Sequence, residues 1–182
     1  ELCSGTLRVS MSGEELACRV REALDQVPGA VGVNNHMGSR ATADPRVMRA
    51  VLGVVKERGL FFLDSFTSPR SVAGQVAAAM GVPAVVNQVF LDHDPSAEAV
   101  ERQLERLARL AERRGWAVGI GHPRLQTYRA LAETLPRWRE RGVQVVPLSA
   151  IIGLAAGAGP TRAGEEAAKP GASPEAISGN PG

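Results

Sequence analysis

The sequence predicts an α/β fold built on a parallel sheet, and three observations lead to this prediction. Short apolar runs alternate with longer segments whose apolar residues recur at helical spacing. Each apolar run ends in a polar residue, and these residues recur about every 27 to 30 positions, the length of one strand-plus-helix unit. They are His36, Asp64, Asp92, His122 and Ser149. Because all strands of a parallel sheet point the same way, we expect these residues to gather at one edge of the sheet.

Capping and stop signals mark the expected helices in order. Ser12 and Glu15 form a capping-box pattern before the first helix, and Asp44 with Pro45 supplies an N-cap and an N1 proline for the second. Glycines or Pro-Gly pairs follow the ends of the first four helices. We expect helices over residues 13–27, 45–58, 71–80, 96–114 and 125–135, the last with a short continuation past Pro136.

The expected strands are short and mostly apolar, which is typical of parallel strands that are buried on both faces. They cover residues 31–33, 60–63, 84–91, 116–120 and 143–146. A closed (β/α) barrel has about eight strands in the best-known case, so we expect an open sheet or one that lacks N-terminal strands. The strand at 31–33 should then be an unpaired edge.

Composition limits the class of protein. The chain has 182 residues, 44% of them hydrophobic and 22% charged, which suits one domain with a substantial core. A net charge of +2 and an aromatic content of 4% argue against a nucleic-acid partner. No apolar stretch reaches about 18 residues, so we expect no transmembrane segment, and no targeting signal is present in the chain as given. Cys3 and Cys18 are too few for a cysteine-based zinc site.

The composition changes near the C-terminus. From Gly153 onward the chain consists largely of Gly, Ala, Pro and Glu, with few large apolar residues to bury. We therefore expect a single domain over residues 1–152 and a disordered tail over residues 153–182.

Polar side chains are most concentrated directly after the expected strand at 31–33. Asn34, Asn35, His36 and Ser39 follow one another there, and a neutral imidazole nitrogen can bind a metal ion. The segment is therefore a candidate for the rim of a site. A turn that is rich in Asn, Gly and Ser for conformational reasons is the alternative interpretation.

Five motifs occur in one order along the chain, each at the end of an expected strand. They are Gly32-Val-Asn-Asn-His-Met-Gly-Ser39, Phe61-Phe-Leu-Asp-Ser65, Val89-Phe-Leu-Asp92, Ile120-Gly-His-Pro123 and Val146-Pro-Leu-Ser149. With these motifs the chain resembles the divergent polysaccharide deacetylase family over residues 4–152. The resemblance implies a deformed parallel (β/α) barrel of the polysaccharide deacetylase type, here incomplete at its N-terminus, in a protein of the bacterial cell envelope or periplasm.

The resemblance also implies a chemistry, the metal-dependent hydrolysis of acetamide groups on a polysaccharide. By this likeness His36 is the metal ligand, zinc is the expected divalent metal, His122 is the general acid and Asp64 is a supporting catalytic carboxylate. The same likeness makes the other polar residues at the strand ends substrate-binding candidates, namely Asn34, Asn35, Ser39, Ser65 and Asp92.

The chain also departs from the family pattern. The family's N-terminal part, with an Asp-Asp pair and a further His motif, has no counterpart here, so we expect a truncated chain that is inactive alone. Phe66 and Asn87 stand where the family tends to have Arg. These departures motivate an alternative function, a non-catalytic carbohydrate-binding or envelope-organising protein on a degenerate deacetylase fold.

Each candidate residue has a structural interpretation as well. His36 could be hydrogen-bonded within its loop, and Asp64 could cap the turn that starts at Ser65. Asp92 lies where helix-start signals account for acidic residues without catalysis. If these residues instead form one functional site, the rings of His36 and His122 should lie within about 10 Å of each other, with Asp64 close enough to orient one of them.

Overall fold

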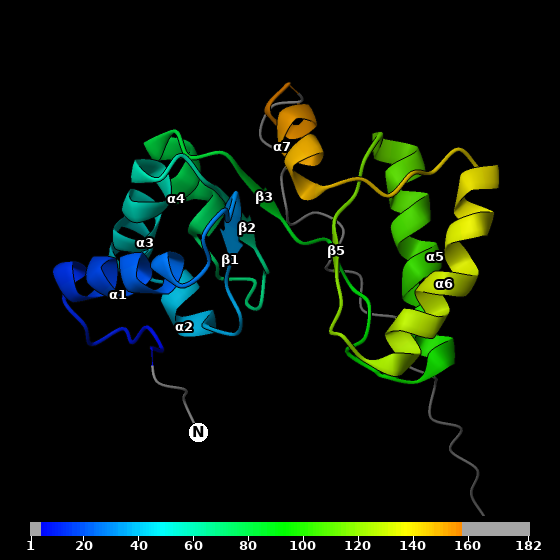
Figure 1. The fold of residues 1–182 in the computed structure, drawn as a ribbon, viewed down its shortest axis with the longest axis horizontal. Helices are drawn as coiled ribbons and strands as arrows, with labels where there is room; N and C mark the ends of the chain where they lie inside the picture. The colour runs from blue at the N-terminus through cyan, green and yellow to red at the C-terminus, as the bar shows by residue number, and fades with distance from the viewer. Residues whose placement is uncertain (1–4, 158–182) are drawn as a thin grey trace, which may run out of the picture.

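The computed structural model describes residues 5–157, which form two groups of helices on a set of short strands (Figure 1). The helices are α1 Gly13–Asp25, α2 Ser39–Thr42, α3 Pro45–Glu57, α4 Ala73–Met80, α5 Ala97–Arg114, α6 Leu125–Glu140 and α7 Leu148–Gly157. The strands are β1 Gly32–Asn34, β2 Phe61–Asp64, β3 Ala84–Val86, β4 Val89–Phe90 and β5 Gly119–Ile120. Mixed α/β architecture with parallel pairing is confirmed.

The strands pair in the order of the sequence. One sheet has the order β1-β2-β3 and a second has the order β4-β5, and every pair is parallel. Since β3 and β4 follow each other directly on the chain, four chain segments lie side by side. The carboxyl ends of all of them therefore face the same edge, as predicted for His36, Asp64, Asp92 and His122. Ser149, the fifth recurring polar residue, lies instead in α7.

The expected strand over residues 84–91 is interrupted at Asn87 and Gln88. At these two residues, side-chain amides replace backbone groups in the hydrogen bonds between strands. Gln88 Oε1 accepts from the backbone N–H of Val118 at 2.7 Å, and Asn87 Nδ2 donates to the carbonyl of Ser65 at 3.3 Å. Gln88 N–H also donates to the carbonyl of Val118 at 3.0 Å. The break thus costs few backbone hydrogen bonds, because side chains satisfy the groups that lose their partners.

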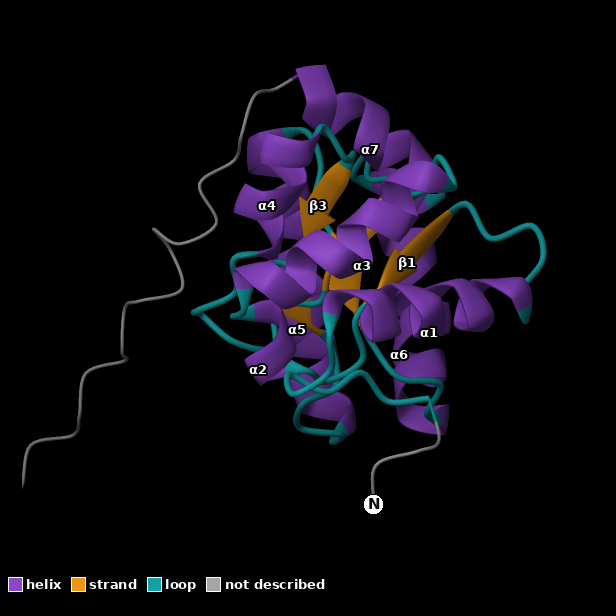
Figure 2. Cartoon of the chain, turned by 90° about the vertical axis from the view of Figure 1, so that its left-hand side faces the viewer, coloured by secondary structure: helices purple, strands orange, loops and turns teal. Residues whose placement is uncertain are grey.

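The cores of the two groups are separate. Val20, Leu52, Phe62 and Val76 belong to a cluster that joins α1, α3 and α4 to β2, and Figure 2 shows these helices beside β1 and β3. A second cluster lies between α5, α6 and β4; its buried members are Val89, Leu91, Val100, Leu104, Ala108, Leu110, Ala130 and Trp138. Each helix is held by packing of its apolar face, the main source of helix stability in proteins.

A third cluster lies on the other face of the strands. Leu63 and Val85 pack there with Val118 and with Ile151 of α7. Phe62 and Leu63 belong to different clusters because successive residues of a strand point to opposite faces. Helix α7 therefore bridges the two groups, and Figure 1 shows it between them.

The caps of two helices are as predicted. Ser12 and Glu15 form a capping box at α1, with hydrogen bonds of 3.1 Å and 2.7 Å. Asp44 accepts from the N–H groups of Arg46 and Val47 ahead of α3, which has Pro45 at its first position. Both caps satisfy N–H groups that have no partner within the helix.

Two predictions about the second half are wrong. Residues 143–146 form no strand, because they find no neighbouring strand to pair with, and Val145 is 67% exposed. The continuation expected past Pro136 is confirmed, because α6 runs through Pro136 to Glu140. Gly153 to Gly157 belong to α7 and not to a disordered tail, because Ile151 and Ile152 anchor that helix on the third cluster. The remainder of the expected tail, residues 158–182, lies outside the described residues.

The described strands do not close into a barrel. Within residues 5–157, β1 has a strand partner on one side only, which confirms the edge predicted for this segment. No helix in that range is long and apolar enough to cross a membrane.

The β1 edge generates a prediction about self-association. Val31 is 65% exposed directly before β1, beside backbone groups that can pair with another strand. We expect the chain to associate through this edge, and Val31→Lys to reduce the association, because a lysine on an edge strand blocks pairing. Sedimentation velocity across a concentration series measures the change. Val27→Lys is the control, since Val27 is 59% exposed but lies outside the strand; equal effects of both substitutions would contradict edge pairing.

Candidate functional site

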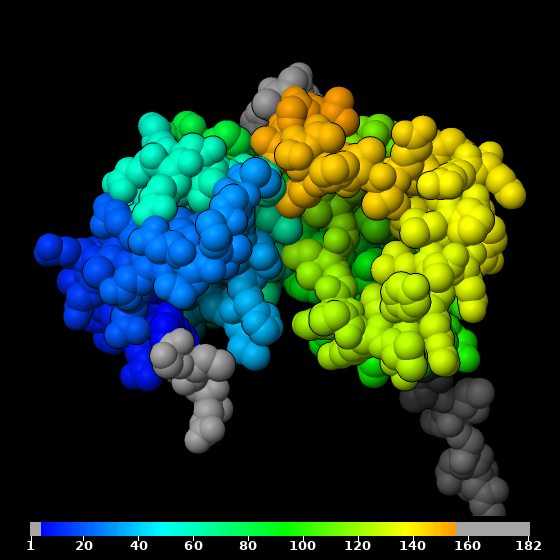
Figure 3. Space-filling view, in the orientation of Figure 1, coloured from blue at the N-terminus to red at the C-terminus, as the bar shows by residue number. Residues whose placement is uncertain are grey.

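His36 and His122 lie together although their strands are not neighbours. His36 follows β1 and His122 follows β5, yet their ring centroids are 6.3 Å apart with an interplanar angle of 61°. This is within the separation expected from the sequence. Both residues are exposed, and Figure 3 shows the surface hollowed between the blue-cyan and yellow-green groups that carry them. Two imidazoles thus face one solvent-accessible space at the carboxyl ends of the strands.

Asp92 is the carboxylate that holds His122. Phe90 of β4 pairs with Ile120 of β5, so the residues two positions further on also lie opposite each other. Asp92 Oδ1 lies 2.8 Å from His122 Nδ1, and Asp92 Oδ2 accepts from the His122 backbone N–H at 2.7 Å. The side chain of Asp92 is 1% exposed whereas that of His122 is 47% exposed. A buried carboxylate therefore fixes an accessible imidazole.

The environment of Asp92 favours its ionised form. Burial raises the pKa of Asp92, but the hydrogen bonds from the His122 ring, the His122 N–H and Thr127 together lower it further, so the pKa lies below its ordinary value. Thr127 Oγ1 donates to Oδ2 at 2.9 Å, and Arg124 Nη1 donates to the Asp92 carbonyl at 2.8 Å. Asp92 is consequently a carboxylate near neutral pH and can accept a hydrogen bond from a protonated Nδ1 of His122.

The sequence did not identify this pair. Asp92 was expected among the substrate-binding residues, and Thr127 was not among the candidates. The available signal was the strand register: Asp92 and His122 each follow the last residue of a predicted strand at a similar offset, and adjacent parallel strands bring such residues together. Thr127 could not be found this way, because it lies in the first turn of α6 and contacts Asp92 from there.

The loop that carries His36 is held from both sides of the histidine. Asn35 Oδ1 accepts from the Ser65 N–H at 2.8 Å, and Asn35 Nδ2 donates to the Met37 carbonyl at 2.9 Å. Ser65 Oγ donates to the Asn35 carbonyl at 2.5 Å. Met37 adopts a left-handed conformation with φ of 58°, an arrangement that costs a non-glycine residue energy and persists because these bonds fix it. The side chains of Asn35 and Ser65 thus position the loop.

Two further candidates border the same loop. Asn34 Nδ2 donates to Ser65 Oγ at 3.1 Å, and Ser39 Oγ donates to the Thr67 carbonyl at 3.1 Å. Both residues are exposed, so a ligand can reach them. They also link the loop that follows β1 to the loop that follows β2.

Asp64 is buried and stabilises the loop that follows β2. Its Oδ1 accepts from the Phe66 N–H at 2.8 Å and its Oδ2 accepts from Ser71 Oγ at 2.6 Å. Both oxygens therefore have partners within the loop after β2, whose Phe66 has φ of 53°. The carboxylate that orients a histidine is that of Asp92, contrary to the expectation that Asp64 would do so.

A metal ion would need more ligands than this part of the chain brings together. Within residues 5–157, no group of three or more His, Cys, Asp or Glu side chains is arranged to hold one. His36 is an exposed imidazole and fits a single ligand position. The Nδ1 atom of His122 is already hydrogen-bonded to Asp92.

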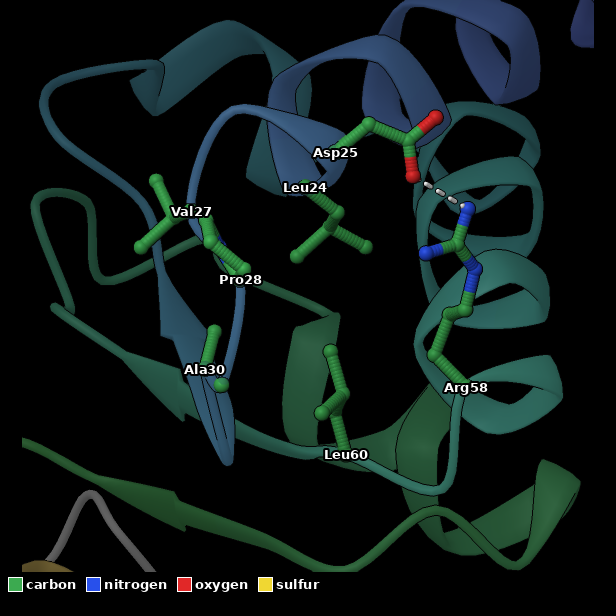
Figure 4. Close-up of a pocket in the computed structure, with 8 residues that line it drawn as sticks. Leu24, Asp25, Val27, Pro28, Ala30, Arg58 and Leu60 are labelled. Atoms are coloured by element: carbon green, nitrogen blue, oxygen red, sulfur yellow. Dashed lines mark hydrogen bonds and ion pairs between the residues drawn. The ribbon is translucent and has the colours of Figure 1, made fainter.

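A separate pocket lies at the opposite end of the strands. Its volume is about 300 Å³. It is lined by Leu24, Asp25, Val27, Pro28, Gly29, Ala30, Arg58 and Leu60. Ala30 and Leu60 precede β1 and β2, so the pocket is at their amino ends (Figure 4). Its ion pair, Asp25 with Arg58 at 2.8 Å, is exposed, and no histidine reaches it.

The chain is similar to proteins of several bacteria. A protein of Haemophilus influenzae described as uncharacterized is 42% identical over 127 residues, which cover 70% of this chain and 45% of that protein. The uncharacterized protein YibQ of Escherichia coli K12 is 38% identical over 128 residues, 70% of this chain and 40% of its own length. The chain thus spans less than half the length of these relatives.

A solved structure has the same fold. The crystal structure of an uncharacterized protein from Agrobacterium tumefaciens C58 matches with a TM-score of 0.80 and 27% identity, covering 82% of this chain and 61% of that one. A family model described as divergent polysaccharide deacetylase matches residues 1–152. With its parallel strands, its polar strand ends and this match, the chain belongs to the divergent polysaccharide deacetylase family.

Proposed function

We propose that this chain carries the proton-transfer group of a hydrolase that removes acyl groups from amide nitrogens of a bacterial envelope polysaccharide. The observation that supports this proposal best is the hydrogen bond between buried Asp92 and exposed His122. A carboxylate behind an imidazole fixes the ring and the tautomer, as general acid–base catalysis requires. Membership of the divergent polysaccharide deacetylase family supports a polysaccharide as the proposed substrate.

The proposal gives each nitrogen of His122 a separate role. Nδ1 faces Asp92 at 2.8 Å, so Nε2 is the nitrogen that can meet a substrate. In the proposed reaction, water adds to the amide carbonyl carbon and releases one proton to the solvent, and the C–N bond then breaks. A protonated His122 gives its Nε2 proton to the departing amine nitrogen, while Asp92 stabilises the positive charge of the imidazolium. His36, 6.3 Å away between ring centroids, borders the space in which the amide would lie.

The proposal includes zinc only at His36. Related deacetylation chemistry uses a divalent metal to polarise a carbonyl and activate water. The described residues supply one exposed candidate ligand and no complete set, so no step of the reaction is derived through a metal. Asn34 and Ser39, both exposed beside His36, are the proposed contacts for sugar hydroxyl groups. A place in the periplasm or cell envelope follows from the proposed substrate.

A second candidate function is non-catalytic binding of an envelope glycan. It is favoured by the lack of a three-ligand cluster within residues 5–157. Asn87 supports it too, since this side chain is buried and engaged with the Ser65 carbonyl and the Val89 N–H. An amide in that place joins the strands and offers no charge to a substrate.

His122→Ala tests the proton transfer. In the intact protein we expect turnover of an N-acetylated glycan oligomer to fall on the order of 10²-fold or more, because the leaving amine loses its acid. Asp92→Asn should lower turnover as well, since the ring loses the carboxylate that fixes its tautomer. Steady-state kinetics measure both effects. His93→Ala is the control, because His93 is exposed on the loop that carries Asp92. An unchanged rate in the His122 variant would remove the basis of the proposal.

Zinc and glycan titrations separate the two functions. If the intact protein is a metal-dependent enzyme, His36→Ala should abolish zinc binding and activity together, whereas His122→Ala should keep the zinc. Isothermal titration calorimetry with zinc, and then with glycan oligomers, measures both affinities. Glycan binding without any zinc affinity would support only the binding protein. An active His36→Ala variant that still binds zinc would contradict the role proposed for His36.

A further inference from the structure

We infer that Thr127 is a positioning residue for His122, acting through Asp92. The inference rests on the proposed function, because it concerns how the proton-transfer group of that site is held. Thr127 lies in α6 and is 4% exposed, and its hydroxyl donates to Asp92 Oδ2 at 2.9 Å. It therefore reaches the site from behind, where no substrate can touch it.

The hydroxyl helps to decide which oxygen of Asp92 faces the ring. Oδ2 receives both the Thr127 hydroxyl and the His122 backbone N–H, and Oδ1 is left to face Nδ1 at 2.8 Å. A carboxylate with one donor fewer on Oδ2 is held less firmly against rotation. Because Asp92 is 1% exposed, water does not readily replace the missing donor.

The methyl group of Thr127 fixes the direction of the hydroxyl. A Cβ atom added to Gly121 would lie 3.1 Å from Thr127 Cγ2 and 3.4 Å from Leu91 Cβ. The Thr127 methyl thus occupies the space beside the residue that precedes His122. A β-branched side chain has few allowed χ1 angles, so seating the methyl also aims the oxygen. One buried side chain thus lies beside Gly121 and is hydrogen-bonded to the carboxylate behind the His122 ring.

The two groups of Thr127 can be removed one at a time. Thr127→Val keeps the shape and removes the hydroxyl, whereas Thr127→Ser keeps the hydroxyl and removes the methyl. Thr134→Val is the matched control, since Thr134 is in the same helix, is 7% exposed and has its recorded contact with Arg137. Circular dichroism verifies the fold of each variant, and Thr127→Ala takes the place of the valine variant if the latter does not fold.

Two readouts distinguish this inference from the function on which it rests. The first is the pKa of Asp92, followed by carbon-13 NMR in the intact protein. We expect it to rise in Thr127→Val, because a hydrogen bond to the ionised form is lost, and to stay low in Thr127→Ser and Thr134→Val. The second is turnover in the intact protein. We expect kcat to fall about tenfold in Thr127→Val, a part of what the acid itself contributes, with KM unchanged.

The outcomes lead to different conclusions. A raised pKa and a lowered kcat in the valine variant, both restored by serine, support Thr127 as a positioning residue. An unchanged pKa and kcat in the valine variant overturn the inference, and so does a serine variant as impaired as the valine variant, because packing alone would then account for the effect. If the wild-type protein shows no hydrolysis, the proposed function fails, and the Asp92 titration still decides whether Thr127 holds the carboxylate.

Discussion

The register of the parallel strands is the constraint on which the site depends. Phe90 lies opposite Ile120, and this pairing places the buried Asp92 carboxylate behind the His122 ring. Asn34 lies opposite Leu63 in the same way, and this pairing brings the loop of His36 against Ser65. A shift of one residue in either ladder would turn each of these side chains to the other face of its strand. The site is thus a product of the backbone as much as of its polar side chains.

A buried carboxylate is costly unless it is hydrogen-bonded, and Asp92 accepts hydrogen bonds at both oxygens. The exposed imidazole gains a fixed orientation from this arrangement. His36 is held differently, through hydrogen bonds to the backbone carbonyls of Asn35 and Met37 on either side of it. One histidine is therefore oriented by its side chain and the other by its loop, a difference that suits the distinct roles proposed for them.

Much of the fold could be predicted from local signals. The capping box at Ser12, the Asp44-Pro45 start and the apolar run before Asp64 all mark elements that the structure contains. Residues 143–146 misled because a β-branched run forms a strand only where another strand accepts its hydrogen bonds. The approach of His36 to His122 was predictable from the shared direction of parallel strands. The partner of His122 was harder to predict, because Asp64 and Asp92 both follow apolar runs. The offset of Asp92 after its strand identifies it as the partner only if the strands before Asp92 and His122 are taken to be neighbours.

The junction at Asn87 and Gln88 leaves the molecule with two cores that share few side chains. The cluster around Leu52 and Phe62 lies on one side of the junction, and the cluster around Leu104 and Trp138 lies on the other. A change of volume in one core can be absorbed by its own neighbours without repacking the other. The two groups can therefore diverge in sequence at different rates, provided that the strand exits, the bridge through α7 and the two amide side chains keep the histidines facing each other.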